Sequence, residues 1–195
     1  AFYAAIEQRD NPKYAGRPIA VGGSPPRGVV MSASYEARPD GVTSAMPSAE
    51  AKRRCPALTF VSPRMQLYKE EGKRIHSIFR EYTDLVEPLS LDEAYLDVTD
   101  PKKGRPSGTL LAKEIRQRIR DETALTASAG VAPNKFLAKV ASDIDKPNGL
   151  TVIPPDEAAQ FLRDLPIEEF HGIGPVTADK MRTLGIASGA DLQDA

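Results

Sequence analysis

The chain has 195 residues, enough for one large or two small domains, and its charges nearly balance at a net −1. Its single cysteine, Cys55, excludes a disulfide framework and a cysteine-ligated zinc site. No run approaches the ~20 apolar residues that a membrane-spanning helix needs, and no signal peptide is visible. The composition therefore predicts a soluble globular protein of a reducing compartment, with no membrane partner.

The charges are unevenly distributed. Residues 13–80 carry 12 Lys or Arg against 5 Asp or Glu, whereas residues 81–195 carry 13 against 20. A basic part beside an acidic part could bind a polyanion on one side and cations on the other. Two solvated surfaces of opposite sign explain the same numbers, and charge alone favours that simpler interpretation.

Periodicity and turn residues predict an α+β body followed by a helical module. In the body, the long helix at 65–82 has an apolar stripe. Ser107 caps another helix, which runs to 123 with Leu110, Leu111, Ile115 and Ile119 inward. Pro154-Pro155 marks the boundary, and residues 156–195 show short helices and no strand. The other predicted elements are strands at 18–23, 29–32, 58–62, 125–131 and 150–153, a strand pair or hairpin arm at 89–98, and helices at 48–54 and 134–144.

Asp92 and Glu93 form an acidic pair inside an otherwise apolar strand. Burying a carboxylate without a partner is costly, and a hard cation such as Mg²⁺ prefers oxygen ligands. Strict alternation would place the two on opposite faces, so sharing a metal requires them at a strand end or bend. An acidic pair on a hairpin turn, bonded to backbone amides or a lysine, fits the same residues. Asp97 is assigned a structural role.

Residues 170–186 contain a second motif, in which Gly172 and Gly174 permit a tight turn before a helix. Free amides at the start of that helix can meet a phosphate. The pattern predicts a helix-hairpin-helix, which contacts the DNA backbone without reading sequence. A plain helical turn with glycine caps is the alternative.

Four further residues carry groups suited to phosphate. Ser32, Tyr35 and Arg38 follow a predicted strand, and Arg38 is the natural bidentate partner of a triphosphate. Lys146 sits at a rigid Lys-Pro-Asn-Gly turn. Taken alone, Tyr35 fits a core position equally well, and the pattern around Lys146 favours a solvated surface lysine.

Together these segments resemble the Y-family DNA polymerases, and most closely the DNA polymerase IV (DinB) type. The matches run along the whole chain, and they include residues 7–12, 34–38, 82–98, 128–135 and 146–149 and the hairpin module. The resemblance implies a palm at 1–12 and 63–153 with an antiparallel or mixed sheet and packed helices, small fingers at 13–62, and an all-α helix-hairpin-helix thumb at 154–195.

The resemblance also implies low-fidelity, translesion synthesis by two-metal nucleotidyl transfer, with two Mg²⁺ ions held by Asp92 and Glu93. Tyr3 matches the steric gate that excludes a ribose 2′-hydroxyl, and Phe2 lies beside it. The triphosphate positions are Ser32, Tyr35, Arg38 and Lys146. The positions implied for DNA contact are Gly172, Ile173, Gly174, Val176 and Thr177.

The implied partners are primer-template DNA, deoxynucleoside triphosphates and, in the full-length protein, a sliding clamp. The implied setting is a monomer in the bacterial cytoplasm, associated with the nucleoid. The family's first catalytic aspartate would lie three positions before Ala1, and its little-finger domain is not in the sequence, so we expect the fragment to be inactive. Pro39-Asp40 departs from the family's basic-aromatic pair. The alternatives are a non-catalytic Y-family paralogue acting as a DNA-binding scaffold, and a generic helix-hairpin-helix repair factor.

Overall fold

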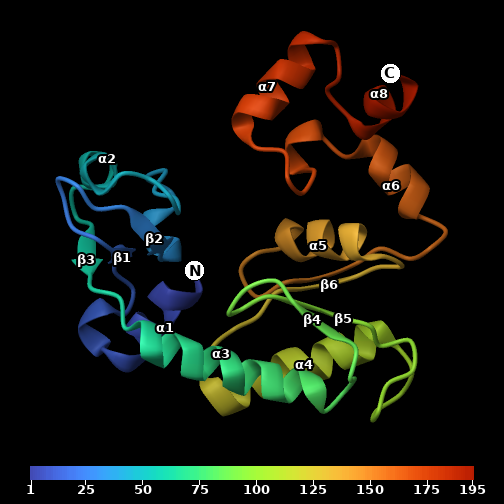
Figure 1. Cartoon of the computed structure of the whole chain (residues 1–195), viewed down its shortest axis with the longest axis horizontal. Helices are drawn as coiled ribbons and strands as arrows, with labels where there is room; N and C mark the ends of the chain where they lie inside the picture. The colour runs from blue at the N-terminus through green and yellow to red at the C-terminus, as the bar shows by residue number, and fades with distance from the viewer. The chain divides into compact units, whose positions relative to one another are not determined.

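The computed structural model describes all 195 residues, and the chain divides into two compact units (Figure 1). Helices alternate with small parallel and antiparallel sheets, so the predicted α+β class is confirmed. Unit 1 comprises Ala1–Ser77, Glu87–Ala94 and Thr123–Leu125, and unit 2 comprises Ile78–Val86, Tyr95–Glu122 and Thr126–Ala195.

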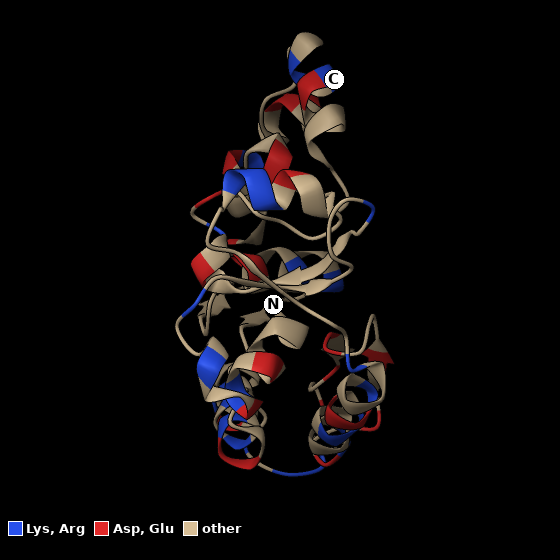
Figure 2. Cartoon of the chain, turned by 90° about the vertical axis from the view of Figure 1, so that its left-hand side faces the viewer, with Lys and Arg blue, Asp and Glu red and all other residues tan.

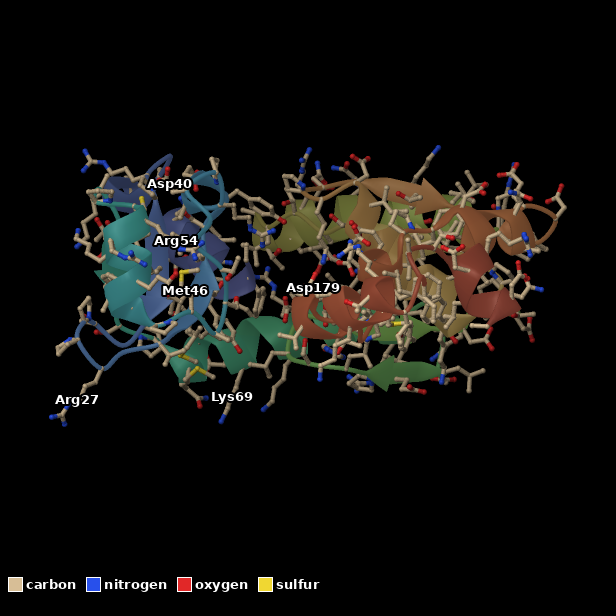
Figure 3. The ribbon with its side chains drawn as sticks, turned by 90° about the horizontal axis from the view of Figure 1, so that it is seen from above. Arg27, Asp40, Met46, Arg54, Lys69 and Asp179 are labelled. Atoms are coloured by element: carbon tan, nitrogen blue, oxygen red, sulfur yellow. The ribbon has the colours of Figure 1, made fainter.

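Unit 1 contains a three-stranded sheet in the order β2-β1-β3. Strand β1 (Ile19–Gly22) runs antiparallel to β2 (Val30–Ala33) and parallel to β3 (Thr59–Val61). Helix α2 spans Ser48–Arg54, as predicted. The small core of this region consists of Ala20, Val30, Ala33, Ala37, Val42, Ala51, Cys55 and Leu58. Basic side chains lie on the surface of unit 1, and Figure 3 shows two of them, Arg27 and Lys69, pointing into solvent.

Two helices complete unit 1. The apolar start of the chain forms α1 (Phe2–Asp10), and α3 spans Met65–Arg80, ending two residues before the predicted end. Short 3-10 turns follow α1 at Pro12–Tyr14 (η1) and β2 at Tyr35–Ala37 (η2). Ion pairs and a tyrosine connect the two helices. We call the residues of this set the α1–α3 network: Glu7, Arg9, Asp10, Arg64, Tyr68 and Glu71.

Strands β4 (Val86–Pro88) and β5 (Ala94–Leu96) pair with each other, and both belong partly to each unit. Helix α4 (Gly108–Thr123) follows Ser107, whose Oγ accepts a hydrogen bond from the Leu110 amide at 3.5 Å. Three of the four side chains predicted to face inward are buried. Leu110 was predicted wrongly, because it is 47% exposed. Adjacent helical positions lie about 100° apart, so Leu110 falls at the edge of the apolar stripe while Leu111 faces the core.

In unit 2, helix α5 (Lys135–Ile144) packs against the parallel pair β6 (Ala129–Val131) and β7 (Leu150–Val152). Asn134 caps α5, since its Oδ1 accepts the Leu137 amide at 2.9 Å. The predicted strand at 125–131 forms only over its last three residues. Acidic and basic residues are interspersed along α3 and α4 (Figure 2).

The C-terminal part contains α6 (Ala158–Asp164), η3 (Ile167–Glu169), α7 (Pro175–Thr183) and α8 (Gly189–Asp194), and no strand, as predicted. A capping box formed by Ser188 and Asp191 starts α8. Helix α8 packs on α6 at Gly189, where a Cβ atom would lie 1.7 Å from the Leu162 carbonyl oxygen. None of the helices is both long and apolar enough to cross a membrane.

Candidate active site and nucleic-acid interface

The acidic pair lies at the end of a strand. Residues 89–92 form bends between β4 and β5, and Glu93 immediately precedes β5. The Glu93 carbonyl oxygen accepts the Leu89 amide at 2.8 Å and the Ser90 amide at 3.2 Å, which closes this acidic loop. Asp92 is exposed and Glu93 half-buried, so the prediction of a pair buried within a strand was wrong. The loop releases both side chains from strand alternation, which is the condition for sharing a metal.

The acidic loop rests closely on helix α3. A Cβ atom on Gly72 would lie 2.5 Å from the Leu91 carbonyl oxygen, so the absence of a side chain at this position permits the approach. Within the loop, the Ser90 hydroxyl donates to Asp92 Oδ1 at 3.0 Å. Sequence reasoning missed Gly72, although a glycine inside a helical pattern signals a close packing contact.

Tyr3, the predicted steric gate, stacks on a second tyrosine. Its ring centroid lies 4.5 Å from that of Tyr68, with an interplanar angle of 13°. The Tyr68 hydroxyl donates to Glu7 Oε1 at 2.6 Å, so the ring beneath Tyr3 is fixed at its far end. Burial and then the negative charge of Asp92 raise the pKa of Tyr3. Tyr3 and Asp92 therefore lie within electrostatic range, and sequence reasoning missed the supporting Tyr68.

Of the predicted triphosphate residues of unit 1, Ser32 lies in β2, and Tyr35 and Arg38 lie in the turn that follows it. Ser32 is buried, and its Oγ accepts the Ala4 amide at 3.4 Å, which ties β2 to the start of α1. Arg38 lies over the Tyr35 ring at 4.2 Å from its centroid. This cation–π contact orients the exposed guanidinium of Arg38. Phe2 packs against Tyr3 at 5.8 Å between ring centroids.

Lys146 belongs to unit 2, in the turn after α5. Its ammonium pairs with Asp143, which also lies 3.4 Å from Lys139 Nζ. Burial works to raise the pKa of Asp143, but the hydrogen bond and charge of Lys146, with the charge of Lys139, outweigh it and lower that pKa. The Lys146 ammonium is therefore positioned by its ion pair with Asp143.

The hairpin glycines have the predicted local geometry. Gly172 has a φ of +94°, and Gly174 precedes α7, where Pro175 takes the first helical position. No heavy atom lies within 4 Å of a Cβ placed on either glycine. Val176 and Thr177 are exposed at the start of α7, and Ile173 is half-buried. The first element of the motif is the 3-10 turn η3, so the leading helix is short.

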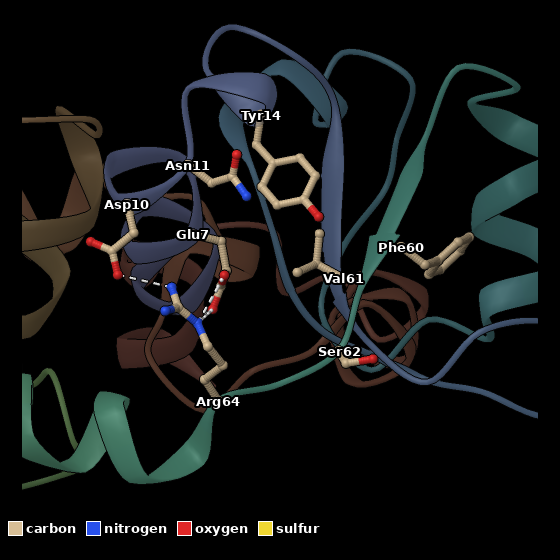
Figure 4. Close-up of a pocket in the computed structure, with 8 residues that line it drawn as sticks. All are labelled: Glu7, Asp10, Asn11, Tyr14, Phe60, Val61, Ser62 and Arg64. Carbon is tan, nitrogen blue, oxygen red and sulfur yellow. Dashed lines mark hydrogen bonds and ion pairs between the residues drawn. The ribbon is translucent and has the colours of Figure 1, made fainter.

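A cavity of about 520 Å³ lies beside the α1–α3 network (Figure 4). One wall carries the ion pairs from Arg64 to Glu7 and Asp10, at 2.9 and 2.8 Å. Tyr14, Phe60 and Val61 line the opposite wall. The charged side chains Glu7, Asp10 and Arg64 of this cavity thus pair with one another.

Comparison with known proteins places the chain in a family. Residues 1–143 match the model of the impB/mucB/samB family, and residues 155–186 match the IMS family HHH motif. The chain belongs to the Y family of DNA polymerases. The resemblance found in the sequence is confirmed, and so is the helix-hairpin-helix motif at the C-terminal end.

Two curated relatives carry the name DNA polymerase IV. The chain is 58% identical over 193 residues to DNA polymerase IV 2 of Agrobacterium fabrum, covering 99% of this chain and 54% of that protein. It is 59% identical over 194 residues to DNA polymerase IV of Bacteroides fragilis, covering 100% and 53%. The chain therefore spans about half the length of the curated relatives it matches.

Solved structures of Y-family polymerases share the fold. DinB from Sulfolobus solfataricus has a TM-score of 0.93 at 40% identity, covering 100% of this chain and 57% of that one. The insertion ternary complex of Dbh DNA polymerase has a TM-score of 0.90 at 40% identity, covering 100% and 58%. The Y-family fold is thus present along the whole chain.

Proposed function

We propose that this chain is the catalytic part of a template-directed, low-fidelity DNA polymerase that extends primers past damaged template bases. One observation carries the proposal: Asp92 and Glu93 lie at the end of a strand, and the charge of Asp92 acts on the stacked Tyr3. The names of the full-length relatives support it. In the reaction, the primer 3′-oxygen bonds to the α-phosphorus of a deoxynucleoside triphosphate, the α–β phosphoanhydride bond breaks, and pyrophosphate leaves.

The side chains of Asp92 and Glu93 are of the ligand type that Mg²⁺ binds. Carboxylate oxygens are the ligands that this ion prefers, and Asp92 is exposed while Glu93 is only half-buried. No group of three or more His, Cys, Asp or Glu side chains could hold a metal in this chain. Asp92 and Glu93 are therefore the two ligands that this proposal assigns to the Mg²⁺ site. When bound, Mg²⁺ would favour the ionised primer hydroxyl and stabilise the leaving oxygens.

The remaining residues bind and select the nucleotide in this proposal. The Tyr3 ring, supported by Tyr68, blocks a ribose 2′-hydroxyl, and Phe2 packs at its side. Arg38, oriented by Tyr35, offers the triphosphate a planar set of donors. Ser32 contributes a hydroxyl from β2, and Lys146 contributes a point charge.

In this proposal the C-terminal module, residues 154–195, binds the primer-template duplex. Exposed amides at Val176 and Thr177, at the start of α7, meet the DNA backbone, and Gly172 and Gly174 let the backbone approach closely. We assign residues 1–12 and 63–153 to the palm, 13–62 to the fingers and 154–195 to the thumb. The full-length protein would act as a monomer with a sliding clamp, in the bacterial cytoplasm at the nucleoid.

Primer extension with Mg²⁺ tests the proposal. The assay uses a full-length polymerase, as long as the relatives, that contains this segment. Asp92→Asn should lower extension by at least about 100-fold, the usual scale for losing transition-state charge stabilisation. Asp97→Asn is the matched control, because the Asp97 carboxylate accepts hydrogen bonds from the amide and the side chain of Thr99, and an asparagine oxygen can also accept them. Tyr3→Ala should raise ribonucleotide incorporation. If Asp92→Asn extends primers like the unchanged enzyme, the assignment is wrong and the non-catalytic scaffold becomes the better description.

A further inference from the structure

We infer that Arg116 is a positioning residue for Lys146, holding the turn that presents this lysine to the triphosphate. The inference rests on the proposed function of Lys146 as a triphosphate ligand. It concerns unit 2 alone, where α4 carries Arg116 and the turn after α5 carries Lys146.

One guanidinium joins two separate segments. Arg116 Nε donates to the Ala127 carbonyl oxygen at 2.8 Å, just before β6. Its Nη2 donates to the carbonyl oxygen of Asn148 at 2.5 Å and to the Asn148 side-chain Oδ1 at 3.0 Å. The planar fork of arginine satisfies three acceptors at fixed angles, which a lysine ammonium on its flexible stem does not reproduce. Arg116 therefore fixes the turn two residues after Lys146 to the edge of β6.

The turn needs such an anchor because its backbone is unusual. Asn148 has a φ of +55°, in the left-handed region that costs free energy for a residue with a side chain. At Gly149, a Cβ atom would lie 1.8 Å from the Asp145 carbonyl oxygen, so the chain folds back tightly on the end of α5. The Gly149 amide donates to Ser128 Oγ at 3.3 Å.

Lys146 thus lies between two anchors. Asp143 holds its ammonium on the α5 side, and Arg116 holds the backbone on the other side. When a triphosphate replaces Asp143 as the partner of the ammonium, only the backbone anchor remains. A fixed backbone reduces the conformational freedom that Lys146 loses on binding, and this stabilises the bound state.

The neighbouring Arg118 provides a matched control on the same helix. It lies two residues further along α4, so it points from a different side of the helix. Its guanidinium pairs with Glu81 at 2.8 Å and with Glu122 at 2.7 Å, so its partners lie outside the turn that carries Lys146. Removing Arg118 therefore tests what a lost α4 arginine does without touching the Lys146 turn.

The test is steady-state primer extension by a full-length polymerase carrying this segment. Arg116→Met should raise the KM for the deoxynucleoside triphosphate about 10-fold and leave kcat within about 2-fold, because it weakens binding in ground and transition states alike. Arg118→Met should leave both values unchanged. Arg116→Lys should restore only part of the loss. In the Lys146→Met background, Arg116→Met should add no further rise in KM, because both changes act through the same ammonium.

Binding of inorganic triphosphate, measured by calorimetry, and amide hydrogen exchange at Asn148 and Gly149 give readouts independent of turnover. Arg116→Met should weaken binding and speed exchange at both amides. If Lys146→Met leaves KM unchanged, the triphosphate role of Lys146 fails, and the inference fails with it. If Lys146→Met raises KM but Arg116→Met does not, or if the two changes are additive, the inference alone is overturned. Should Arg116→Met fail to fold, Arg116→Lys with the same readouts decides between these outcomes.

Discussion

Two clusters in this molecule combine a tyrosine with carboxylates and basic side chains, but they differ in burial. In the α1–α3 network of unit 1, Glu7 accepts from Arg64 and Tyr68, and the Glu7 side chain is only 5% exposed. In unit 2, Glu81 accepts from Arg118 and Lys103 at 2.8 and 2.7 Å, and its side chain is 48% exposed. We call the second set the Glu81 network; it also includes Tyr82, Glu114 and Glu122.

The difference decides what each cluster contributes. A charge held away from water depends on its partners, and removing one partner leaves a costly desolvated group. A charge that remains in water loses little when its partner goes, because solvent replaces the contact. The α1–α3 network lies directly beneath Tyr3, so its rigidity bears on the proposed nucleotide site. The Glu81 network joins the loop after β5 to α4 and to the turn that follows α3.

Glu7→Ala should produce the largest effect. It removes the acceptor shared by Tyr68 and Arg64, and we expect a loss of about 3 kcal/mol in the free energy of unfolding. Urea unfolding followed by circular dichroism measures this loss. Glu81→Ala, the matched change in the Glu81 network, should cost much less. Equal losses at the two positions would contradict the comparison.

Removing the tyrosine hydroxyls gives a smaller and sharper contrast, because both rings are fully buried. Tyr68→Phe should destabilise by about 1.5 kcal/mol, since it leaves the buried Glu7 without a neutral donor. Tyr82→Phe should destabilise by about 0.5 kcal/mol, because Glu114, which accepts from its hydroxyl at 2.7 Å, is exposed and can turn to water. The same urea titrations measure both. The ranking is wrong if Tyr82→Phe proves the more costly change.

Alkaline pH should act through the buried tyrosine of the α1–α3 network. Burial, and then the hydrogen bond to Glu7, raise the pKa of Tyr68 to about 12 from its usual 10.0. The unfolded chain then releases this proton before the folded chain does, so the contribution is full below pH 10 and is lost between pH 10 and 12. Stability profiles over this range should fall less steeply for Tyr68→Phe. Identical slopes for the two proteins would remove Tyr68 from the titration.

Acid pH should act on the Glu81 network with the smallest effect. Hydrogen bonds from Arg118 and then Lys103 lower the pKa of Glu81 to about 2 from 4.5. The unfolded chain binds this proton first as the pH falls, so the contribution is present above pH 4.5 and is lost between pH 4.5 and 2. Glu81→Gln should flatten the stability profile slightly in that window, and 1 M salt should reduce the difference. A difference that survives salt would show that the pair is less solvated than its exposure implies.

Local sequence signals predicted most helices and strands. Helix α2 was placed at its observed bounds, and the cap at Ser107 lies where the sequence indicated it. Side-chain identity near a helix end determines its cap directly, so these elements are accessible to sequence reasoning. Leu110 was predicted wrongly because it lies at the edge of the apolar face of α4. Sequence periodicity does not show whether a residue at that edge is buried or exposed.

The candidate site was harder to predict because long-range contacts form it. The residue types at Asp92 and Glu93 suggested metal chemistry, but the turn that exposes Asp92 depends on pairing between β4 and β5. The stacking of Tyr3 on Tyr68 joins residues 65 positions apart, and the contact from Arg116 to Asn148 joins residues 32 positions apart. No local pattern contains these pairs, so they had to come from the structure.

Gly189 shows how narrowly one position can constrain sequence variation. The Leu162 carbonyl occupies the space that any side chain at 189 would need, and a backbone atom cannot adopt another rotamer to make room. Even alanine would therefore push α8 away from α6. Of the nineteen possible replacements none avoids the collision, because every one of them carries a Cβ. Functional variants of this protein should therefore carry no substitution at Gly189, and their substitutions in α8 should fall at exposed positions such as Gln193.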